Sequence, residues 1–391
     1  MLLQKYHYRL MLAGLCLLPT FSFAANLGNL SSRNQGVLIS TQGANEQLCA
    51  AASPAGDINN DGMSDFIMGA PGAGTVSGSG NAYLIFGSTQ FNSTVSNGIV
   101  VSGLNGSNGF AVLSDSIDDA LATTVARAGD INNDGIDDVM IAAPGIDTNN
   151  QPNTGQVAVM FGRTSSNFPA TVSRSSLTGG QGILINGVSG NDRIGVSLSG
   201  NSDINNDGID DMLIGAPVAD GEQAGAGAAY VVFGSEQLTN LNSPIDLSNL
   251  DGTNGFAIHG AQTGDNTGIS VAFAGDINRD GIGDMLIGAN AADPNGIEGA
   301  GRAYIIFGKQ GNFPAVFNLS NLNTQDLFGF VVTGANPFDD IGRRVSPAGD
   351  INGDGFNDVL ISGFSNLGEN ANVGTLTILF GGRRLNQVNG A

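Results

Sequence analysis

The stretch DINNDGIDD, residues 130–138, decides the fold, because close copies of it recur four more times. Every copy has the pattern Asp-x-Asn-x-Asp-Gly-x-x-Asp, and the first residues of successive copies are 73, 73, 73 and 74 residues apart. A recurrence at so constant an interval predicts a repeat architecture, in which one supersecondary unit is copied and stacked. The copies begin at Asp57, Asp130, Asp203, Asp276 and Asp350.

Four short apolar runs accompany each copy. In the fourth unit they cover residues 255–258, 268–274, 285–287 and 304–308, and the acidic loop lies between the second and third runs. Short runs that are rich in β-branched residues and bounded by Gly, Asn, Asp and Pro are typical of strands. Four antiparallel strands repeated radially predict a blade of a β-propeller.

Two further motifs recur at fixed places in the units. Phe-Gly ends the fourth run in all five units, and Gly-Ala-Pro or a variant follows the third run, as at residues 69–71 and 215–217. With these motifs the chain resembles the FG-GAP repeat family, which includes the propeller of integrin α subunits and its bacterial relatives. The resemblance covers about residues 30–382. It implies an exported propeller that contacts other proteins or surfaces.

The expected fold class is all-β, a propeller of five FG-GAP blades with four antiparallel strands each. Integrin-type propellers have seven blades, so the alternative is an open or incomplete part of a seven-bladed propeller. We favour a closed ring of five, because closure removes exposed sheet edges. The propeller is expected at residues 25–391, with units at about 30–103, 104–176, 177–249, 250–321 and 322–382 and a short tail at 383–391.

Each acidic loop offers a set of ligands made only of oxygen. Positions 1, 3 and 5 supply side-chain oxygens, position 7 a backbone carbonyl and position 9 a carboxylate, while the glycine at position 6 allows a sharp turn. An EF-hand loop alternates its ligands in the same way, but this pattern lacks the glutamate at position 12 and is flanked by strands. Oxygen ligands select calcium over zinc or copper.

The sequence therefore predicts up to five bound Ca²⁺ ions and no other cofactor. The predicted ligands are Asp57, Asn59, Asp61, Met63 and Asp65; Asp130, Asn132, Asp134, Ile136 and Asp138; Asp203, Asn205, Asp207, Ile209 and Asp211; Asp276, Asn278, Asp280, Ile282 and Asp284; and Asp350, Asn352, Asp354, Phe356 and Asp358.

Electrostatics favours a cation in these loops, which hold 15 of the 35 acidic residues. Two like charges about 4 Å apart repel by roughly 4 kcal/mol at an effective dielectric near 20, and bound calcium reverses that sign. The alternative is that the loops are ordinary Asp, Asn and Gly turns between strands. A further acid precedes each loop by eleven residues and is either a turn residue or an outer partner of the calcium loop: Glu46, Asp119, Asp192, Asp265 and Asp339.

The first residues have the features of a secretory signal peptide. Lys5 and Arg9 precede an apolar run at residues 10–18, and Ser22-Phe23-Ala24 provides small residues for cleavage after Ala24. The protein is then exported to the periplasm, the cell surface or the medium. No later segment has the roughly 18 apolar residues of a spanning helix. Losing Lys5 and Arg9 changes the net charge from −21 to −23, which excludes binding to nucleic acid by charge.

Candidate catalytic residues are hard to find in the sequence. His259 is the only histidine after residue 24, and neither a Gly-x-Ser-x-Gly elbow nor a phosphate-binding loop is present. We therefore expect a monomeric, non-catalytic binding or adhesion module for a protein or surface partner. A glycan-binding lectin is the alternative, although the chain has no Trp for stacking. A propeller-based hydrolase or lyase is a third.

The segments between the third and fourth runs differ in length while the rest of the unit stays constant. They cover residues 72–80, 145–156, 218–228 and 291–301. Variable loops on a rigid scaffold are where binding usually occurs. They are the expected place of partner contact.

Overall fold

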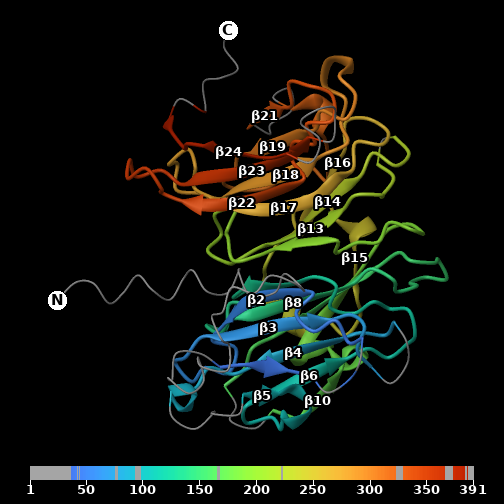
Figure 1. Cartoon of the computed structure of the whole chain (residues 1–391), viewed down its shortest axis with the longest axis vertical. Coiled ribbons are helices and arrows are strands. Elements are labelled where there is room, and N and C mark those ends of the chain that lie inside the picture. The colour runs from blue at the N-terminus through green and yellow to red at the C-terminus, as the bar shows by residue number, and fades with distance from the viewer. Residues whose placement is uncertain are drawn as a thin grey trace.

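The strands of this protein form a series of separate small sheets in a computed structural model (Figure 1). The structure describes residues 37–41, 43, 45–74, 78–92, 98–164, 168–221, 223–322, 329–365, 373–383 and 385. In this part of the chain all regular structure is β-strand or short 3-10 helix, which confirms the predicted all-β class. No helix among these residues is both long and apolar enough to cross a membrane.

Five of the sheets are the predicted blades, which we number from the N-terminus. Blade one contains, in spatial order, β10 (Thr171–Ser173), β6 (Gly109–Leu113), β4 (Asn81–Ile85), β3 (Asp65–Ala70) and β2 (Ala51–Gly56). Blade two contains β15 (Ile245–Asp246), β11 (Gly182–Asn186), β9 (Gln156–Met160), β8 (Asp138–Ala143) and β7 (Val125–Gly129). Blade three contains β20 (Val316–Asn318), β16 (Gly255–His259), β14 (Ala228–Val232), β13 (Met212–Ala216) and β12 (Ser197–Ser199).

The last two blades have fewer described strands. Blade four contains β21 (Gly329–Thr333), β19 (Arg302–Ile306), β18 (Asp284–Ala289) and β17 (Thr267–Gly275). Blade five contains β24 (Val373–Leu379), β23 (Asp358–Ser365) and β22 (Arg344–Gly349). A separate pair is formed by β1 (Ile39–Ser40) and β5 (Ile99–Val100), which are parallel.

Short 3-10 helices connect several strands. They are η1 (Thr89–Asn92), η2 (Val101–Gly103), η3 (Arg174–Ser176), η4 (Gly179–Gln181), η5 (Glu236–Asn240), η6 (Leu247–Asn249), η7 (Pro294–Gly296) and η8 (Leu319–Asn321).

The blades are out of phase with the sequence units. Strand β4 pairs antiparallel with β6, which is the first strand of the next unit, from Ile85↔Gly109 to Asn81↔Leu113. Blades two, three and four are completed in the same way by β11, β16 and β21. A short parallel strand from the end of the same unit as this completing strand then lies outside it in the first three blades. Each sheet is therefore built from successive units, which ties neighbouring units together.

The hydrophobic core lies between neighbouring blades. Leu84 and Phe110 of blade one pack in one buried cluster with Val139 and Ile141 of blade two, and comparable clusters fill the next three junctions. Both faces of an inner sheet are thus covered, which explains why runs such as 157–160 are apolar without alternation.

The series of blades does not close on itself among the described residues. Strand contacts link blade one to two, two to three, three to four and four to five, but no comparable contact joins blade five to blade one. In Figure 1 blade one (blue) lies at the bottom and blade five (red) at the top. The blade architecture is confirmed, whereas the closed ring of five stays a prediction.

Candidate metal-binding loops

The five acidic loops occupy the same place in every blade. Each connects the second strand of its unit to the third, as residues 57–65 connect β2 to β3. Within each loop the polar side chains shape the backbone. Both carboxylate oxygens of Asp130 accept backbone amides, from Asp134 (3.0 Å) and Gly135 (2.8 Å). Asn132 Oδ1 also accepts the Asp134 amide (3.0 Å), and Asp134 Oδ1 accepts that of Ile136 (3.0 Å). The other four loops repeat these contacts.

Two positions of the loop have left-handed backbone. The glycine at position 6 has φ between +85° and +93° in all five loops. A Cβ on Gly135 would meet nothing within 4 Å, so the conformation rather than space calls for glycine. Position 4 is left-handed as well, with φ near +60° at Asn60, Asn133, Asn206 and Arg279. The asparagines at this position are a sequence signal for that left-handed backbone, because asparagine adopts it more readily than most residues.

The aspartate at position 9 is buried and ties the loop to the sheet. Asp138 Oδ2 accepts the amide of Ile131 (3.0 Å), the second residue of its loop, and Oδ1 accepts that of Gly162 (2.8 Å). Gly162 is the glycine of Phe-Gly, and the same pair of bonds recurs at Asp65, Asp211, Asp284 and Asp358. The Phe-Gly motif therefore serves the acidic loop, a connection that the sequence did not reveal.

Burial makes these carboxylates unfavourable as free anions. It raises the pKa of Asp138 and of Asp284 to about 8 and that of Asp65 to about 6, although backbone hydrogen bonds to each carboxylate oppose the shift. The carboxylates at positions 5 and 1 of the same loop raise these pKa values further. The pKa of Asp211 lies well above its usual range for the same reasons. A cation in the loop would favour the ionised forms.

The donor set fits calcium in its chemistry, since it consists only of carboxylate, amide and carbonyl oxygens. Among the described residues, however, no three His, Cys, Asp or Glu side chains form a group ready to hold a metal ion. The oxygens of each loop would have to draw closer together around an ion. Calcium binding therefore remains a prediction for all five sets of ligands.

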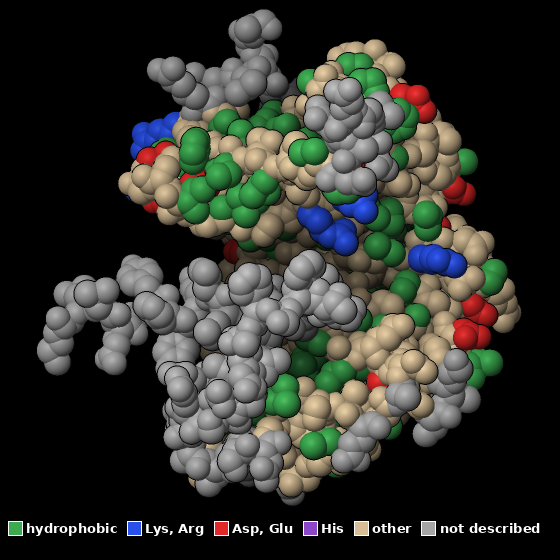
Figure 2. Space-filling model, viewed as in Figure 1, with side chains coloured by type: hydrophobic (Ala, Val, Ile, Leu, Met, Phe, Trp, Pro, Cys, Tyr) green, Lys and Arg blue, Asp and Glu red, His purple; other side chains and the backbone are tan. Residues whose placement is uncertain are grey.

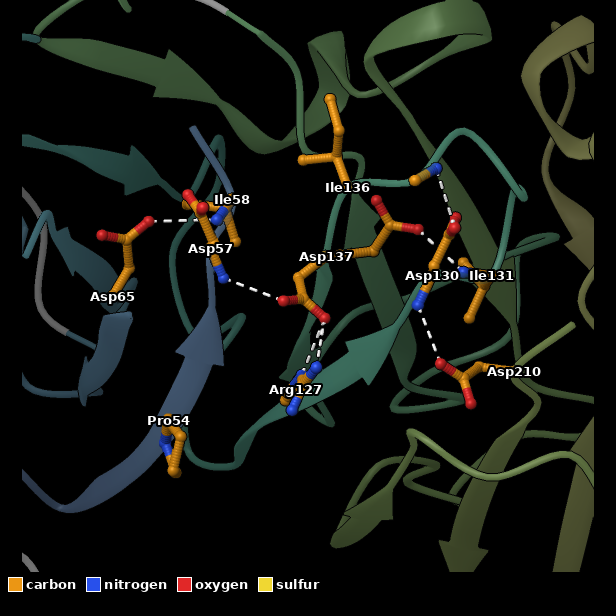
Figure 3. A network of polar contacts seen from close by, with 12 residues as sticks. Pro54, Asp57, Ile58, Asp65, Arg127, Asp130, Ile131, Ile136, Asp137 and Asp210 are labelled. Carbon is orange, nitrogen blue, oxygen red and sulfur yellow. Dashed lines mark hydrogen bonds and ion pairs between the residues drawn. The ribbon is translucent and has the colours of Figure 1, made fainter. Parts of the chain in front are cut away.

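Neighbouring loops are hydrogen-bonded to each other across the blade junctions (Figure 3). Asp137 Oδ2 accepts the backbone amide of Asp57, the first residue of the preceding loop (2.8 Å), and Oδ1 accepts Arg127 Nε (2.9 Å). Asp210 accepts the amide of Asp130 in the same way (3.0 Å). In the next two junctions, where position 8 is Gly283 or Asn357, the direction is reversed: the backbone amide of Gly283 donates to the carbonyl of Asp203 (3.1 Å) and that of Asn357 to the carbonyl of Asp276 (3.4 Å).

A second bond joins each of the first four loops to the blade that follows. The backbone carbonyl of Ile131 accepts the amide of Ser235, the residue after Phe-Gly in the next unit (2.8 Å). Equivalent bonds run from Arg163 to Ile58, from Lys309 to Ile204 and from Gly382 to Ile277. The acidic loops are therefore structural parts of the blade junctions, whatever they bind.

The second recurrent acid belongs to a turn at the opposite end of the blade. Asp192 accepts the amide of Ser189 (2.7 Å), Asp265 that of Gln262 (3.1 Å) and Asp339 that of Asn336 (2.8 Å). Asp119 accepts the amide of Ser116 (3.2 Å). A whole strand separates these acids from the acidic loop that follows. The turn interpretation is therefore confirmed for these four acids, which do not lie beside that loop as outer partners.

The variable segments between the third and fourth strands lie at that same end. Each is closed at its base by one backbone bond, as from Gly155 to the carbonyl of Ile146 (3.0 Å) and from Gly301 to that of Ala292 (2.9 Å). An aspartate braces the interior, since Asp147 Oδ1 accepts the amide of Asn153 (2.8 Å). The tips, such as residues 149–151, are exposed. The tip at residues 149–151 is exposed although Asn149 Nδ2 donates to Asp246 Oδ2 (3.3 Å), and an anchored loop with an exposed tip suits surface recognition.

Known proteins match this chain along its repeats. The model of the FG-GAP repeat family matches residues 50–85, 122–160, 195–232 and 267–306. Integrin alpha-PS5 of Drosophila melanogaster is 29% identical over 172 residues, 42% of this chain and 14% of the integrin. Integrin alpha-4 of Xenopus laevis is 33% identical over 175 residues, 44% of this chain and 14% of the integrin.

A relative of another kind matches more of the chain. Phosphatidylinositol-glycan-specific phospholipase D of Dictyostelium discoideum is 29% identical over 324 residues, 78% of this chain and 31% of that protein. The chain thus spans less than a third of the length of these curated relatives. Each segment matched by the family model contains one acidic loop and three consecutive strands, as residues 50–85 contain β2, β3 and β4. The chain therefore contains FG-GAP repeats in blades one to four, and along its repeats it is similar to integrin α subunits.

Proposed function

We propose that this protein is an exported, calcium-binding propeller that acts as a non-catalytic binding module for a protein or surface partner. The observation that carries the proposal is the recurrence of one oxygen-rich loop, with a buried carboxylate, at every blade. Calcium in these loops would neutralise the carboxylates and brace the junctions between blades. The exposed tips of the variable loops, at the other end of the blades, would then be held in place for a partner.

Calcium titration calorimetry of the chain without residues 1–24 tests the metal half of the proposal. We expect binding of up to five ions. The double variant Asp130→Asn and Asp134→Asn should lower that number by one, because it removes two carboxylates from one loop but keeps their shape. Glu298→Gln is the matched control, since Glu298 is an exposed acid outside the loops. The absence of calcium binding would leave the loops as turns.

A partner screen tests the other half. With calcium present, the protein is applied to a panel of extracellular-matrix proteins and to a glycan array. Binding to a protein that weakens when the tip 149–151 is replaced by glycine and serine supports the proposal. Binding to glycans alone would favour the lectin alternative.

The similarity to a phospholipase D favours a second candidate function, in which the repeats belong to a lipid-cleaving enzyme. The alignment covers 31% of that relative, so its named activity is a hypothesis for this chain. Incubation with a glycosylphosphatidylinositol-anchored protein, with release from the lipid as the readout, separates the two. Release would overturn a purely non-catalytic role.

A further inference from the structure

Strand β24 of blade five is left without the neighbour that every other blade has. Its equivalents β4, β9 and β14 are buried along their whole length, whereas every residue of β24 except Leu379 is exposed. Leu376 is 61% exposed and Ile378 45%. Figure 2 shows hydrophobic side chains gathered at the surface over this blade. An open, apolar strand edge is a template for pairing.

The repeat identifies the strand that is missing. In blades one to four the edge of the fourth strand of a unit is covered by the first strand of the next unit. The first unit has such a strand, β1, but the described residues contain no earlier unit whose fourth strand could receive it. One edge of β1 is paired with β5, as one edge of β6 is paired with β10. The other edge of β6 is paired with β4, but the corresponding edge of β1 has no strand beside it among the described residues.

We propose that residues 37–40 pair antiparallel with β24 of the same chain and close the series of blades into a ring. The four existing blades give the register without ambiguity, since the residue before Phe-Gly always faces the first glycine of the partner strand. Val37 then lies opposite Ile378, Leu38 opposite Thr377, Ile39 opposite Leu376 and Ser40 opposite Thr375.

The faces of blades five and one support the same pairing independently. The second residue of the acidic loop is at most 1% exposed in the first four units, where the next blade covers it, but Ile351 of the fifth is 49% exposed. The phenylalanine of Phe-Gly is at most 6% exposed in the first four units, and Phe380 is 51% exposed. Blade five lacks a following blade as well as a strand.

Blade one carries a hydrophobic cluster beside β1 that is already buried. Met68, Tyr83 and Ile85 form a hydrophobic cluster on the face turned away from blade two, and Ile39 of β1 and Ile99 of β5 pack against it. Docking of β1 on β24 would bring this cluster to blade five and complete a fifth core between blades. The strand and the cluster move together because they are already in contact.

The same chain is a better source of the strand than a second copy. An intramolecular strand is present at high effective concentration, and pairing with it leaves no further edge. A second copy would dock head to tail and leave its own β24 open, which extends into filaments. The two occupants therefore predict different assembly states.

Engineered disulfides test two things together: the pairing register of β1 with β24, and whether β1 comes from the same chain or from a second copy. Leu38→Cys with Thr377→Cys should cross-link under mild oxidation, because the two residues would be directly opposite and on one face of the sheet. Leu38→Cys with Leu376→Cys is the control, since a shift of one residue places the second side chain on the other face. Peptide mass spectrometry identifies the linked residues apart from any native cysteine, and size-exclusion chromatography reports the assembly state.

The proposal expects the 38–377 link in a monomer, with at least about tenfold more product than the control pair. The same link found only in dimers or larger species would assign β24 to a second copy and overturn the proposal. No 38–377 link in either species would also overturn it. Hydrogen exchange of the unaltered protein covers the case in which the variants fail to fold: the β24 amides should exchange as slowly as those of β4, and rapid exchange would contradict the pairing.

Discussion

At the scale of single residues, the aspartate at position 9 has two functions that oppose each other. Asp138 accepts two backbone amides, which holds the loop to the strand that ends in Phe-Gly. It is also fully buried beside Asp134 and Asp130, and its pKa rises to about 8. The residue is suited to the loop only when a proton or a cation balances its charge.

The pH dependence of stability follows from that shift. The pKa of Asp138 and Asp284 is about 8 in the folded protein and about 3.9 in an unfolded chain. Their contribution to stability is therefore fully present below about pH 4 and is lost as the pH rises through 8. In a chelator, thermal midpoints should fall between about pH 4 and pH 8. Millimolar calcium should reduce or reverse that fall, and an equal fall with calcium would contradict calcium ligation.

Asp137 gives a prediction that does not depend on metal. Asp137→Ala removes the acceptor of the Asp57 amide and the partner of Arg127 at the junction of blades one and two. We expect a loss of about 1–3 kcal/mol in the free energy of unfolding, mostly from the amide left unpaired. Urea unfolding measures it. Ser64→Ala is the control at the same position of the first loop, where the side chain is exposed, and an equal loss in both variants would remove Asp137 from its proposed role.

At the scale of elements, the Phe-Gly corner explains why a glycine recurs after the fourth strand. A Cβ on Gly162 would lie 2.2 Å from the carbonyl oxygen of Asp137 and 2.5 Å from Ile136 Cγ2. The strand end must approach the acidic loop this closely for its amide to reach Asp138. Space, and not a left-handed backbone, calls for glycine here.

Gly162→Ala should therefore destabilise the protein by more than about 2 kcal/mol, because backbone on the facing loop has to move. Gly103→Ala is the matched control, since a Cβ there would meet nothing within 4 Å. It should change stability by no more than about 0.5 kcal/mol. Denaturant midpoints of the two variants compare them directly, and similar midpoints would show that the corner can relax.

At the scale of the whole molecule, stability is shared along a row of similar junctions. Each junction contains a hydrophobic core and bonds between one acidic loop and the next blade. In such an array the folded state is held by repeated nearest-neighbour contacts. A ligand that binds every loop therefore acts on every junction at once.

Under the proposed function, calcium bound to the folded loops and not to the unfolded chain should raise the thermal midpoint through mass action. At a free concentration about 100 times the dissociation constant, each site contributes about 2.7 kcal/mol. Differential scanning calorimetry in millimolar calcium and in excess chelator measures the difference. The Asp130→Asn and Asp134→Asn variant should lose part of it, and equal midpoints in both buffers would remove calcium from the stability of the fold.

The sequence alone established the repeat, the strands and the acidic loops, because these depend on local patterns: alternating turn residues, short apolar runs and a loop whose own side chains fold it. The turn role of Asp192 and its equivalents was one of two open interpretations. The left-handed backbone at Asn133 could also be predicted from the sequence, because asparagine adopts that conformation more readily than most residues.

Tertiary structure decided which unit supplies each strand and what the loops contact. Pairing of β4 with β6 joins residues of different units, and no local pattern distinguishes it from pairing within one unit. The bond between Asp137 and the Asp57 amide spans 80 residues, and the bond of Gly162 to Asp138 depends on two strands lying side by side. Sequence specifies what each unit can form, whereas contacts between units exist only once the chain has brought them together.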